Sequence, residues 1–163
     1  MKTIHLTQGK VTLVDDDDFE WLSQFTWRAK QIKMIRRPNL WYAYRSVNHD
    51  QCIGMHVDIA NRSMNSKYPQ CDHKDGDGLN NQKSNLRPCT SAQNNWNRRK
   101  APGQHSKFKG VSWHRRDLVW VAKIMCHHKA KWLGSFKNEH VAALAYDAAA
   151  KKLFGDFARL NFP

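Results

Sequence analysis

The chain has 163 residues, with 27 Lys and Arg against 14 Asp and Glu, and a formal net charge of +13. This length suits one ordinary domain or two small ones. The charge makes nucleic acid the leading class of partner; basic residues scattered over solvated faces are the alternative. No stretch approaches the ~20 apolar residues of a membrane span, and the N-terminus lacks the apolar core of a secretory signal. We therefore expect a soluble cytoplasmic protein without a membrane partner.

The first segment, residues 1–50, is expected to be a scaffold of strands and one helix. Alternating residues from Ile4 to Val14 predict a hairpin around Gln8-Gly9-Lys10. The acidic run Asp15–Asp18 predicts a helix start, because carboxylates complement the dipole at a helix N-terminus without any need for a metal. Trp41–Val47 predicts a strand. The segment is either structural scaffold or an additional DNA surface.

Residues 51–100 contain the most distinctive chemistry of the chain. Asp72 and His73 stand side by side just before a turn that contains glycines, which permit positive φ angles. Ser84–Cys89 follows as a second strand, and Thr90 or Ser91 is a suitable N-cap for a helix. The expected unit is strand, loop, strand and helix.

In such a unit, a carboxylate at the end of the first strand and an amide oxygen from the first helical turn can meet at one point. We therefore predict Asp72 and Asn94 as ligands of a divalent cation, Mg²⁺ in the first place and Mn²⁺ as the alternative. His73, with an ordinary pKa of about 6.5, is the expected general base. On a regular strand Asp72 and His73 would point to opposite faces, and a strand end that enters a glycine turn can relieve this.

This stretch has two other interpretations. The first is an ordinary hydrated turn, with Asp72 and His73 as a surface pair. The downstream Asn85 and Asn94 favour a nuclease over that interpretation. The second is a calcium-binding EF-hand, which we reject because no Glu stands at the twelfth loop position.

The order and spacing of these residues resemble the HNH, or His-Me finger, nucleases. The similarity is to the phage and intron-associated homing type, with a pattern D-H-x-x-G, D-N, S-N-L-R and N, and it covers residues 56 to about 99. The residues to which the resemblance assigns roles are the base His73, the metal ligands Asp72 and Asn94, the loop-holding Asn85 and the supporting His56.

The chain departs from the family pattern at several positions around this motif. Val57 stands where the family has Arg, and Lys74 stands where it has an aliphatic residue. Asn80-Asn81-Gln82 replaces the usual Asp-Asn-Arg. These departures concern substrate positioning more than the core chemistry.

Residues 101–106 have the composition of a linker, and the last segment covers 107–163. Asn138 is a suitable N-cap for a helix over Glu139–Phe154, whose alanines let it lie close on a sheet, and Gly155 ends it. The runs that predict a three-stranded antiparallel sheet are Lys109–Arg116, Trp120–Met125 and Lys131–Phe136.

One face of this sheet is expected to be basic and exposed. If Trp120, Ala122 and Ile124 face the helix, the alternate residues of the same strand face outward; these are Val121, Lys123 and Met125. A basic sheet face can enter the major groove of DNA.

This last segment closely resembles the AP2 DNA-binding domain across nearly all of residues 107–163. The matching runs are Phe108–Val111, Trp120–Ile124, Trp132–Phe136, Ala142–Ala149 and Asn161–Pro163. The resemblance implies DNA recognition by the sheet. Lys109 replaces a usual Arg, and Ser112 and His114 stand where well-known plant members have Arg, so their preferred sequence cannot be carried over. The expected DNA contacts are Lys109, Ser112, His114, Arg116, Lys123 and Trp132, with Arg87 from the middle segment.

The sequence as a whole predicts an α+β protein: a ββα-metal nuclease unit, then an AP2-like sheet packed on one helix. The expected function is a metal-dependent endonuclease that hydrolyses DNA phosphodiester bonds, of site-preferring nicking or homing type. The alternative is a non-catalytic, sequence-specific DNA-binding regulator. An RNA-binding protein fits less well, because the sheet lacks the aromatic pattern of RNA-binding sheets. Double-stranded DNA is the expected partner, and we expect a monomer without a protein partner.

Overall fold

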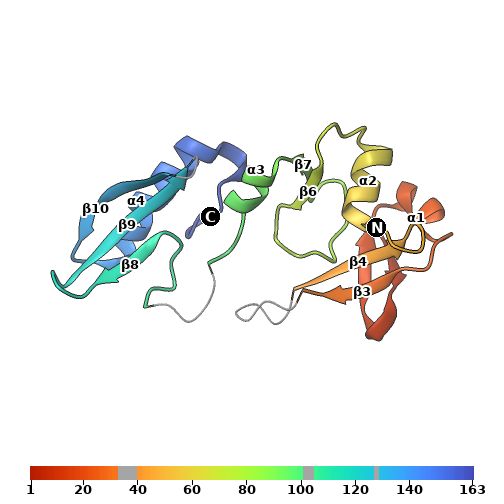
Figure 1. The fold of residues 1–163 in the computed structure, drawn as a ribbon, viewed down its shortest axis with the longest axis horizontal. Helices are drawn as coiled ribbons and strands as arrows, with labels where there is room; N and C mark the ends of the chain where they lie inside the picture. Colours follow the sequence, from red (N-terminus) through yellow and green to blue (C-terminus); the bar gives the residue numbers. More distant parts are fainter. Residues whose placement is uncertain (33–39, 101–104, 127–128) are drawn as a thin grey trace. The chain divides into compact units, whose positions relative to one another are not determined.

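A computed structural model describes residues 1–32, 40–100, 105–126 and 129–163 (Figure 1). The chain divides into two compact units, unit 1 (Met1–Asn94) and unit 2 (Asn95–Pro163). In the described parts, the strands pair antiparallel and form four separate sheets. The predicted α+β class is therefore confirmed. Within these same ranges, no helix is long and apolar enough to span a membrane.

The boundary between the two units lies inside α3 (Ser91–Trp96). It therefore precedes the linker expected at 101–106, of which residues 101–104 lie outside the described residues. Residues 1–50 belong to the same unit as residues 51–94. The N-terminal segment is thus part of the unit that holds the predicted catalytic residues.

Unit 1 begins with the hairpin and helix that the sequence predicts. The hairpin consists of β1 (Lys2–His5) and β2 (Val11–Val14), joined by the 3-10 turn η1 (Thr7–Gly9). The helix α1 (Asp16–Leu22) follows, with Asp15 at its N-cap position and Asp16, Asp17 and Asp18 in its first turn. The acidic run is therefore a helix start, as predicted.

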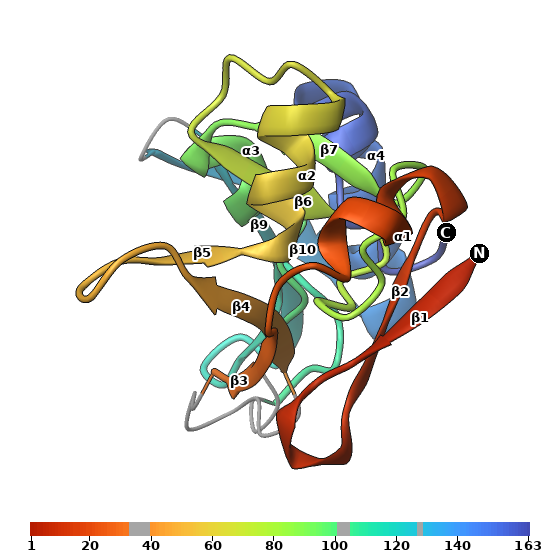
Figure 2. The same ribbon diagram turned by 90° about the vertical axis from the view of Figure 1, so that its right-hand side faces the viewer.

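A three-stranded sheet and a second helix come next, and the sequence had indicated only the middle strand. The sheet has the order β3-β4-β5, formed by β3 (Arg28–Gln31), β4 (Trp41–Ser46) and β5 (Cys52–Gly54). The helix α2 (Met55–Ser63) begins directly after β5 and buries Met55, Ile59 and Ala60. Figure 2 shows the β1–β2 hairpin in red and the β4–β5 strands leading into α2.

The strand, loop, strand and helix expected for the nuclease segment are present in that order. The first strand is β6 (Gln70–His73), which pairs with β7 (Leu86–Cys89), and α3 follows. Cys71 and Leu86 join the core of unit 1 together with Leu22, Met55 and Ile59. Element order alone is shared by unrelated proteins, so the nuclease assignment stays a prediction.

Unit 2 is the three-stranded antiparallel sheet with one long helix that the sequence predicts. The sheet has the order β10-β9-β8, and α4 caps on Asn138, whose side chain accepts hydrogen bonds from the backbone N–H groups of His140 and Val141. Gly155 ends the helix with a φ of 52°. The elements are β8 (Val111–His114), β9 (Val119–Cys126), β10 (Lys129–Phe136), α4 (Glu139–Phe154) and η2 (Gly155–Phe157).

The small residues of α4 allow the helix to lie close to the sheet. Ala142, Ala143 and Ala150 are fully buried, and Ala122 and Ile124 of β9 face them in the core. Val121 was expected to be exposed on the opposite face of β9, but only 2% of it is accessible. That expectation was wrong because strand alternation sets the direction of a side chain and not how much its neighbours cover it.

Candidate functional site

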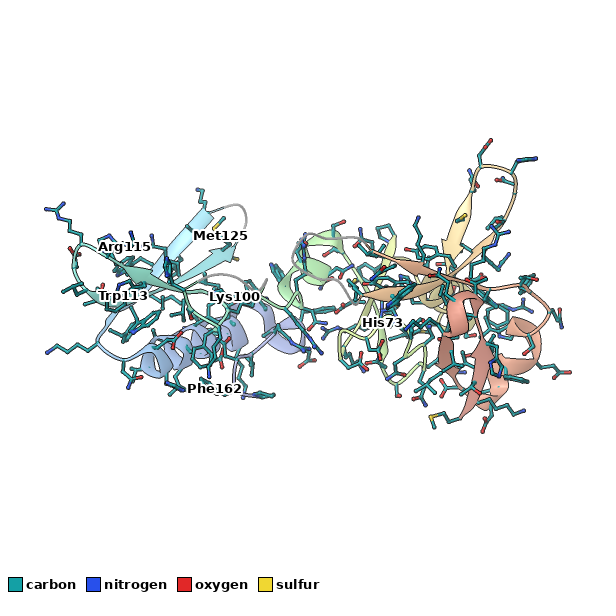
Figure 3. All side chains as sticks on the ribbon, turned by 90° about the horizontal axis from the view of Figure 1, so that it is seen from below. His73, Lys100, Trp113, Arg115, Met125 and Phe162 are labelled. Atoms are coloured by element: carbon teal, nitrogen blue, oxygen red, sulfur yellow. The ribbon has the colours of Figure 1, made fainter. Side chains whose placement is uncertain are left out.

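The predicted catalytic residues lie at the end of β6 and on the elements around it. Figure 3 shows His73 inside unit 1, and only 4% of its surface is accessible. Its Nε2 lies 3.1 Å from Oδ1 of Asn81. Its ring lies 4.9 Å from the ring of His56 and 5.7 Å from the ring of Tyr42, centroid to centroid. Tyr42 and His56 thus form two walls around the imidazole.

Burial lowers the pKa of His73 below its ordinary value, and the hydrogen bond to Asn81 and the charges of nearby carboxylates only partly offset this. The ring is therefore neutral at pH 7 and has a lone pair to accept a proton. A neutral imidazole in a water-poor site is the form that a general base requires.

His56 lies next to the His73 ring. It lies in the first turn of α2, and burial followed by the charge of His73 lowers its pKa to about 3. Its Nδ1 is buried without a hydrogen-bond partner in the described residues. A Cβ at Gly54 would lie 2.6 Å from Cε1 of His56, so the glycine leaves space for the ring. So low a pKa makes His56 a poor proton acceptor at neutral pH, and its supporting role stays a prediction.

Asp72 lies beside Arg87, its cross-strand partner in β7. Only 7% of Asp72 is accessible, and Nε and Nη2 of Arg87 lie 3.0 and 2.8 Å from its Oδ2. The structure thus joins a predicted metal ligand to a residue predicted to contact DNA. The guanidinium neutralises the carboxylate and would compete with a cation for Oδ2.

Asn94 belongs to α3 and contacts the face of β6 that carries Asp72. Its Nδ2 donates to Oε1 of Gln70 at 3.0 Å, and Gln70 precedes Asp72 by two residues on the strand. This bond turns the amide oxygen of Asn94 away from Gln70. One carboxylate and one amide oxygen are hard donors that fit Mg²⁺. In the described ranges, no group of three or more His, Cys, Asp or Glu side chains is placed to hold a metal ion.

Asn85 has the loop-holding contacts that the resemblance implies. Its Nδ2 donates to Oδ1 of Asp75 at 3.0 Å and to the carbonyl oxygen of Asn80 at 2.8 Å. Its Oδ1 accepts from the backbone N–H of Asp75 at 3.1 Å. The Asn85 side chain, at the β7 end of the loop between β6 and β7, therefore binds both the start and the middle of that loop.

Asp72 and His73 point toward different partners, as strand alternation predicts. The first faces Arg87 and the second faces Asn81. Coulombic interaction with Asp72 still reaches the His73 ring. The two side chains therefore diverge and yet remain electrostatically coupled.

Sequence reasoning missed the residues that hold His73 and its loop from the N-terminal segment. Asn81 and Thr12 are both fully buried and hydrogen-bonded to each other. The acidic run of α1 also binds the loop: Oδ2 of Asp15 accepts from the backbone N–H of Lys83 at 2.7 Å, and Nζ of Lys83 lies 2.7 Å from Asp17. These contacts join residues more than sixty positions apart, which local sequence patterns do not reveal. The one available signal was Asn81, a polar and uncharged residue in an otherwise acidic loop.

In unit 2, four of the residues predicted to contact DNA lie on the sheet face opposite α4: Ser112, His114, Lys123 and Trp132. Lys123 and Trp132 are cross-strand partners, and Nζ of Lys123 lies 5.4 Å from the Trp132 ring centroid. Trp132 is 54% exposed and Met125 is 58% exposed, so two large apolar side chains stand on this face of the sheet. Ser112 and His114 are also exposed on β8, and Figure 3 shows Met125 on the side of the sheet away from α4.

Two further predicted DNA contacts lie off this face. Arg116 is exposed in the turn between β8 and β9. Lys109 precedes β8, its Nζ donates to the carbonyl oxygen of Trp96, and its backbone N–H donates to Oδ1 of Asn161 at 2.7 Å. Lys109 is thus used for contacts within unit 2, and its DNA role stays a prediction.

The chain is similar to plant DNA-binding proteins over a short stretch. It is 41% identical over 63 residues to an ethylene-responsive transcription factor of Arabidopsis thaliana, covering 37% of this chain and 34% of the relative. It is 50% identical over 58 residues to dehydration-responsive element-binding protein 2A of the same plant, covering 34% and 17%. It is 43% identical over 63 residues to an AP2/ERF and B3 domain-containing protein of Oryza sativa subsp. japonica, covering 39% and 17%.

No family model matches the chain. The chain spans at most 34% of the length of the relatives named above. None of these three is described as a nuclease. Over about 60 residues, the chain is homologous to the AP2/ERF DNA-binding domain of plant transcription factors.

Proposed function

We propose that unit 2 binds duplex DNA through the sheet face opposite α4. The proposal is supported by the homology to proteins named as transcription factors and element-binding proteins. It is also supported by the exposed side chains of Lys123, Trp132 and His114 on one face of the sheet. A sheet face can enter the major groove of DNA. A cation on it can then contact the phosphates that flank the groove, and an aromatic ring can contact the edges of the bases.

The test is the salt dependence of duplex binding by the full chain. The slope of log K against log salt is negative, and each phosphate contact that is lost makes it less steep by ~0.9. We expect Lys123→Ala to make the slope less steep by about that amount. Lys152→Ala, on the exposed side of α4, is the matched control and is expected to leave the slope unchanged. Equal slopes for the two variants would refute binding through this face.

We propose further that unit 1 is a metal-dependent endonuclease that hydrolyses the DNA held by unit 2. The observation that carries this proposal is the buried, neutral His73 beside Asp72 at the end of β6, where the following loop is held by Asn85. A buried base is costly for a folded protein and is found most often where a reaction needs it. The described residues contain one such site, which favours one cut strand per binding event.

In the proposed reaction, His73 takes the proton of a water molecule whose oxygen attacks the phosphorus, and the bond to the leaving oxygen breaks. Asp72 and Asn94 are the residues that would hold a divalent cation. When bound, the cation supplies charge neutralisation for the phosphate and the leaving oxygen. Arg87 keeps the Asp72 carboxylate in place and provides a second positive charge next to the site.

His73→Ala separates catalysis from binding. We expect it to abolish nicking, because the base acts in the transition state, and to leave the affinity for duplex DNA within a few fold of the wild type. Affinity is measured in EDTA so that cleavage does not interfere. Loss of binding and cleavage to the same degree would contradict the assignment of His73 as the base.

A second candidate function is a non-catalytic, sequence-specific DNA-binding regulator. The comparisons favour this candidate over the nuclease, because the relatives are named as a transcription factor, an element-binding protein and an AP2/ERF and B3 domain-containing protein, and each matches about 60 residues of this chain. Under this hypothesis unit 1 is a scaffold, and the pairing of Asp72 with Arg87 is a structural ion pair. Metal-dependent cleavage of DNA distinguishes the two functions directly.

A further inference from the structure

A chain of buried hydrogen bonds leads from a backbone carbonyl to the His73 ring. The Thr12 hydroxyl lies 2.7 Å from the carbonyl oxygen of Leu79. Nδ2 of Asn81 lies 2.7 Å from Oγ1 of Thr12, and Oδ1 of Asn81 lies 3.1 Å from Nε2 of His73. Thr12 and Asn81 are fully buried, and His73 is 4% accessible, so bulk water does not reorient these groups.

The chemistry of its first member fixes the direction of this chain. A carbonyl oxygen can only accept, so the Thr12 hydroxyl donates its one proton to Leu79. The Sδ atom of Met55, at 3.9 Å from Oγ1, is the other acceptor within reach, and it too can only accept. In either case, Oγ1 of Thr12 meets Asn81 with a lone pair.

The next two members follow from this direction. A lone pair on Thr12 requires the NH₂ end of the Asn81 amide, so Oδ1 is the end that faces His73. An amide oxygen only accepts, so Nε2 of His73 must donate. Rotating the amide by half a turn would place Oδ1 against Thr12, and the hydroxyl would then have to leave the Leu79 carbonyl.

The backbone holds Asn81 in the same place. Its N–H donates to the carbonyl oxygen of Leu13 at 2.9 Å, and the N–H of Leu13 donates to Leu79 at 2.9 Å. The β1–β2 hairpin is therefore joined to the β6–β7 loop by both backbone and side-chain bonds. This gives the N-terminal segment a role beyond scaffolding.

We infer that Thr12 and Asn81 are positioning residues that fix the tautomer of His73, with the proton on Nε2 and the lone pair on Nδ1. This inference rests on the proposed nuclease function for its catalytic meaning, because it names Nδ1 as the atom that takes the proton of the attacking water. The tautomer itself does not depend on that function. The wrong tautomer would present an N–H where a base needs a lone pair.

The direct test is nitrogen NMR of the full chain labelled with ¹⁵N-histidine. The His73 ring signals are identified by their absence in His73→Ala. We expect an unprotonated Nδ1 and a protonated Nε2 in the wild type at pH 7. A protonated Nδ1 in the wild type would overturn the inference, and this outcome needs no variant to fold.

Variants of Thr12 then test how the tautomer is fixed. Thr12→Val keeps the shape but removes the hydroxyl, so the amide of Asn81 can turn; we expect mixed tautomers and a nicking rate lower by roughly 10- to 100-fold. Thr12→Ser is expected to restore both. The matched control is Thr3→Val, at an exposed position of the same hairpin. Wild-type spectra in a folded Thr12→Val would overturn the role of Thr12.

The readouts also separate this inference from the proposed function. A protein with the expected tautomer that never cleaves DNA refutes the nuclease and leaves the tautomer established. A protein that cleaves DNA with the proton on Nδ1 supports the nuclease and overturns the inference. The circular dichroism spectrum of Thr12→Val is measured beside the nicking rate. A purely structural defect would change this spectrum, whereas loss of positioning alone would leave it unchanged.

Discussion

Lowering the pH from 7 to 5 is expected to destabilise unit 1 through His56. The folded protein holds the pKa of this ring at about 3, because burial and the neighbouring His73 disfavour its charged form. An unfolded histidine has a pKa of about 6.5. Between these two values the unfolded chain binds more protons than the folded chain, so the free energy of unfolding falls as the pH falls.

The magnitude follows from the distance between the pH and the unfolded pKa. Each pH unit below about 6.5 costs ~1.4 kcal/mol while the folded ring stays neutral. At pH 5 the loss is therefore about 2 kcal/mol from His56 alone, and any folded pKa below about 4 gives nearly the same loss. His73 changes stability in the same direction, because its pKa is also lowered by burial.

The assay is urea unfolding at both pH values, followed by the methyl signals of Leu22 and Ile59, which report on unit 1 alone. The His56→Gln variant cannot be protonated and is expected to lose about 2 kcal/mol less than the wild type between pH 7 and pH 5. His49→Gln, at an exposed position of the same unit, is the matched control. An equal pH dependence in wild type and His56→Gln would refute the reasoning.

Two further predictions concern residues on which the folds of the units depend. Gly110→Ala should cost unit 2 about 2–4 kcal/mol, because φ is +77° and the new Cβ would lie 1.9 Å from the Tyr146 ring. Gly155→Ala, with φ +52° and open space, should cost clearly less when the thermal unfolding of both variants is compared, and equal losses would contradict the steric argument. Asn85→Ala removes three hydrogen bonds and should destabilise unit 1 by about 2–3 kcal/mol. The exposed Asn61→Ala is its control, and a loss below that of the control would refute the loop-holding role.

The elements that could be predicted from the sequence are those with strong local signals. The hairpin of β1 and β2 has alternating residues around a glycine turn, and α4 has its Asn138 cap and its alanines. By contrast, α2 starts without a side-chain cap and has polar residues in its middle, so its helical form depends on packing Met55 and Ile59 into the core. Only Ala29 of β3 is buried, which leaves almost no pattern to detect.

In the candidate site too, residues with a local sequence signal could be predicted, and contacts between distant positions could not. Asp72, His73 and Asn85 lie within one short stretch, so their spacing was enough to nominate them. The contact of Asn81 with Thr12 joins positions 69 residues apart. The pairing of Asp72 with Arg87 depends on the register of two strands, which spacing does not fix.

The central claim is that unit 1 hydrolyses the DNA that unit 2 binds. It is tested most directly by incubating supercoiled plasmid with the full chain in Mg²⁺, in Mn²⁺ and in EDTA, beside His73→Ala, and separating nicked from linear forms. The account predicts nicking that needs the metal ion and is lost in His73→Ala. Intact plasmid under every condition, also with the sequence that the protein binds most tightly, would contradict the nuclease and favour the DNA-binding regulator.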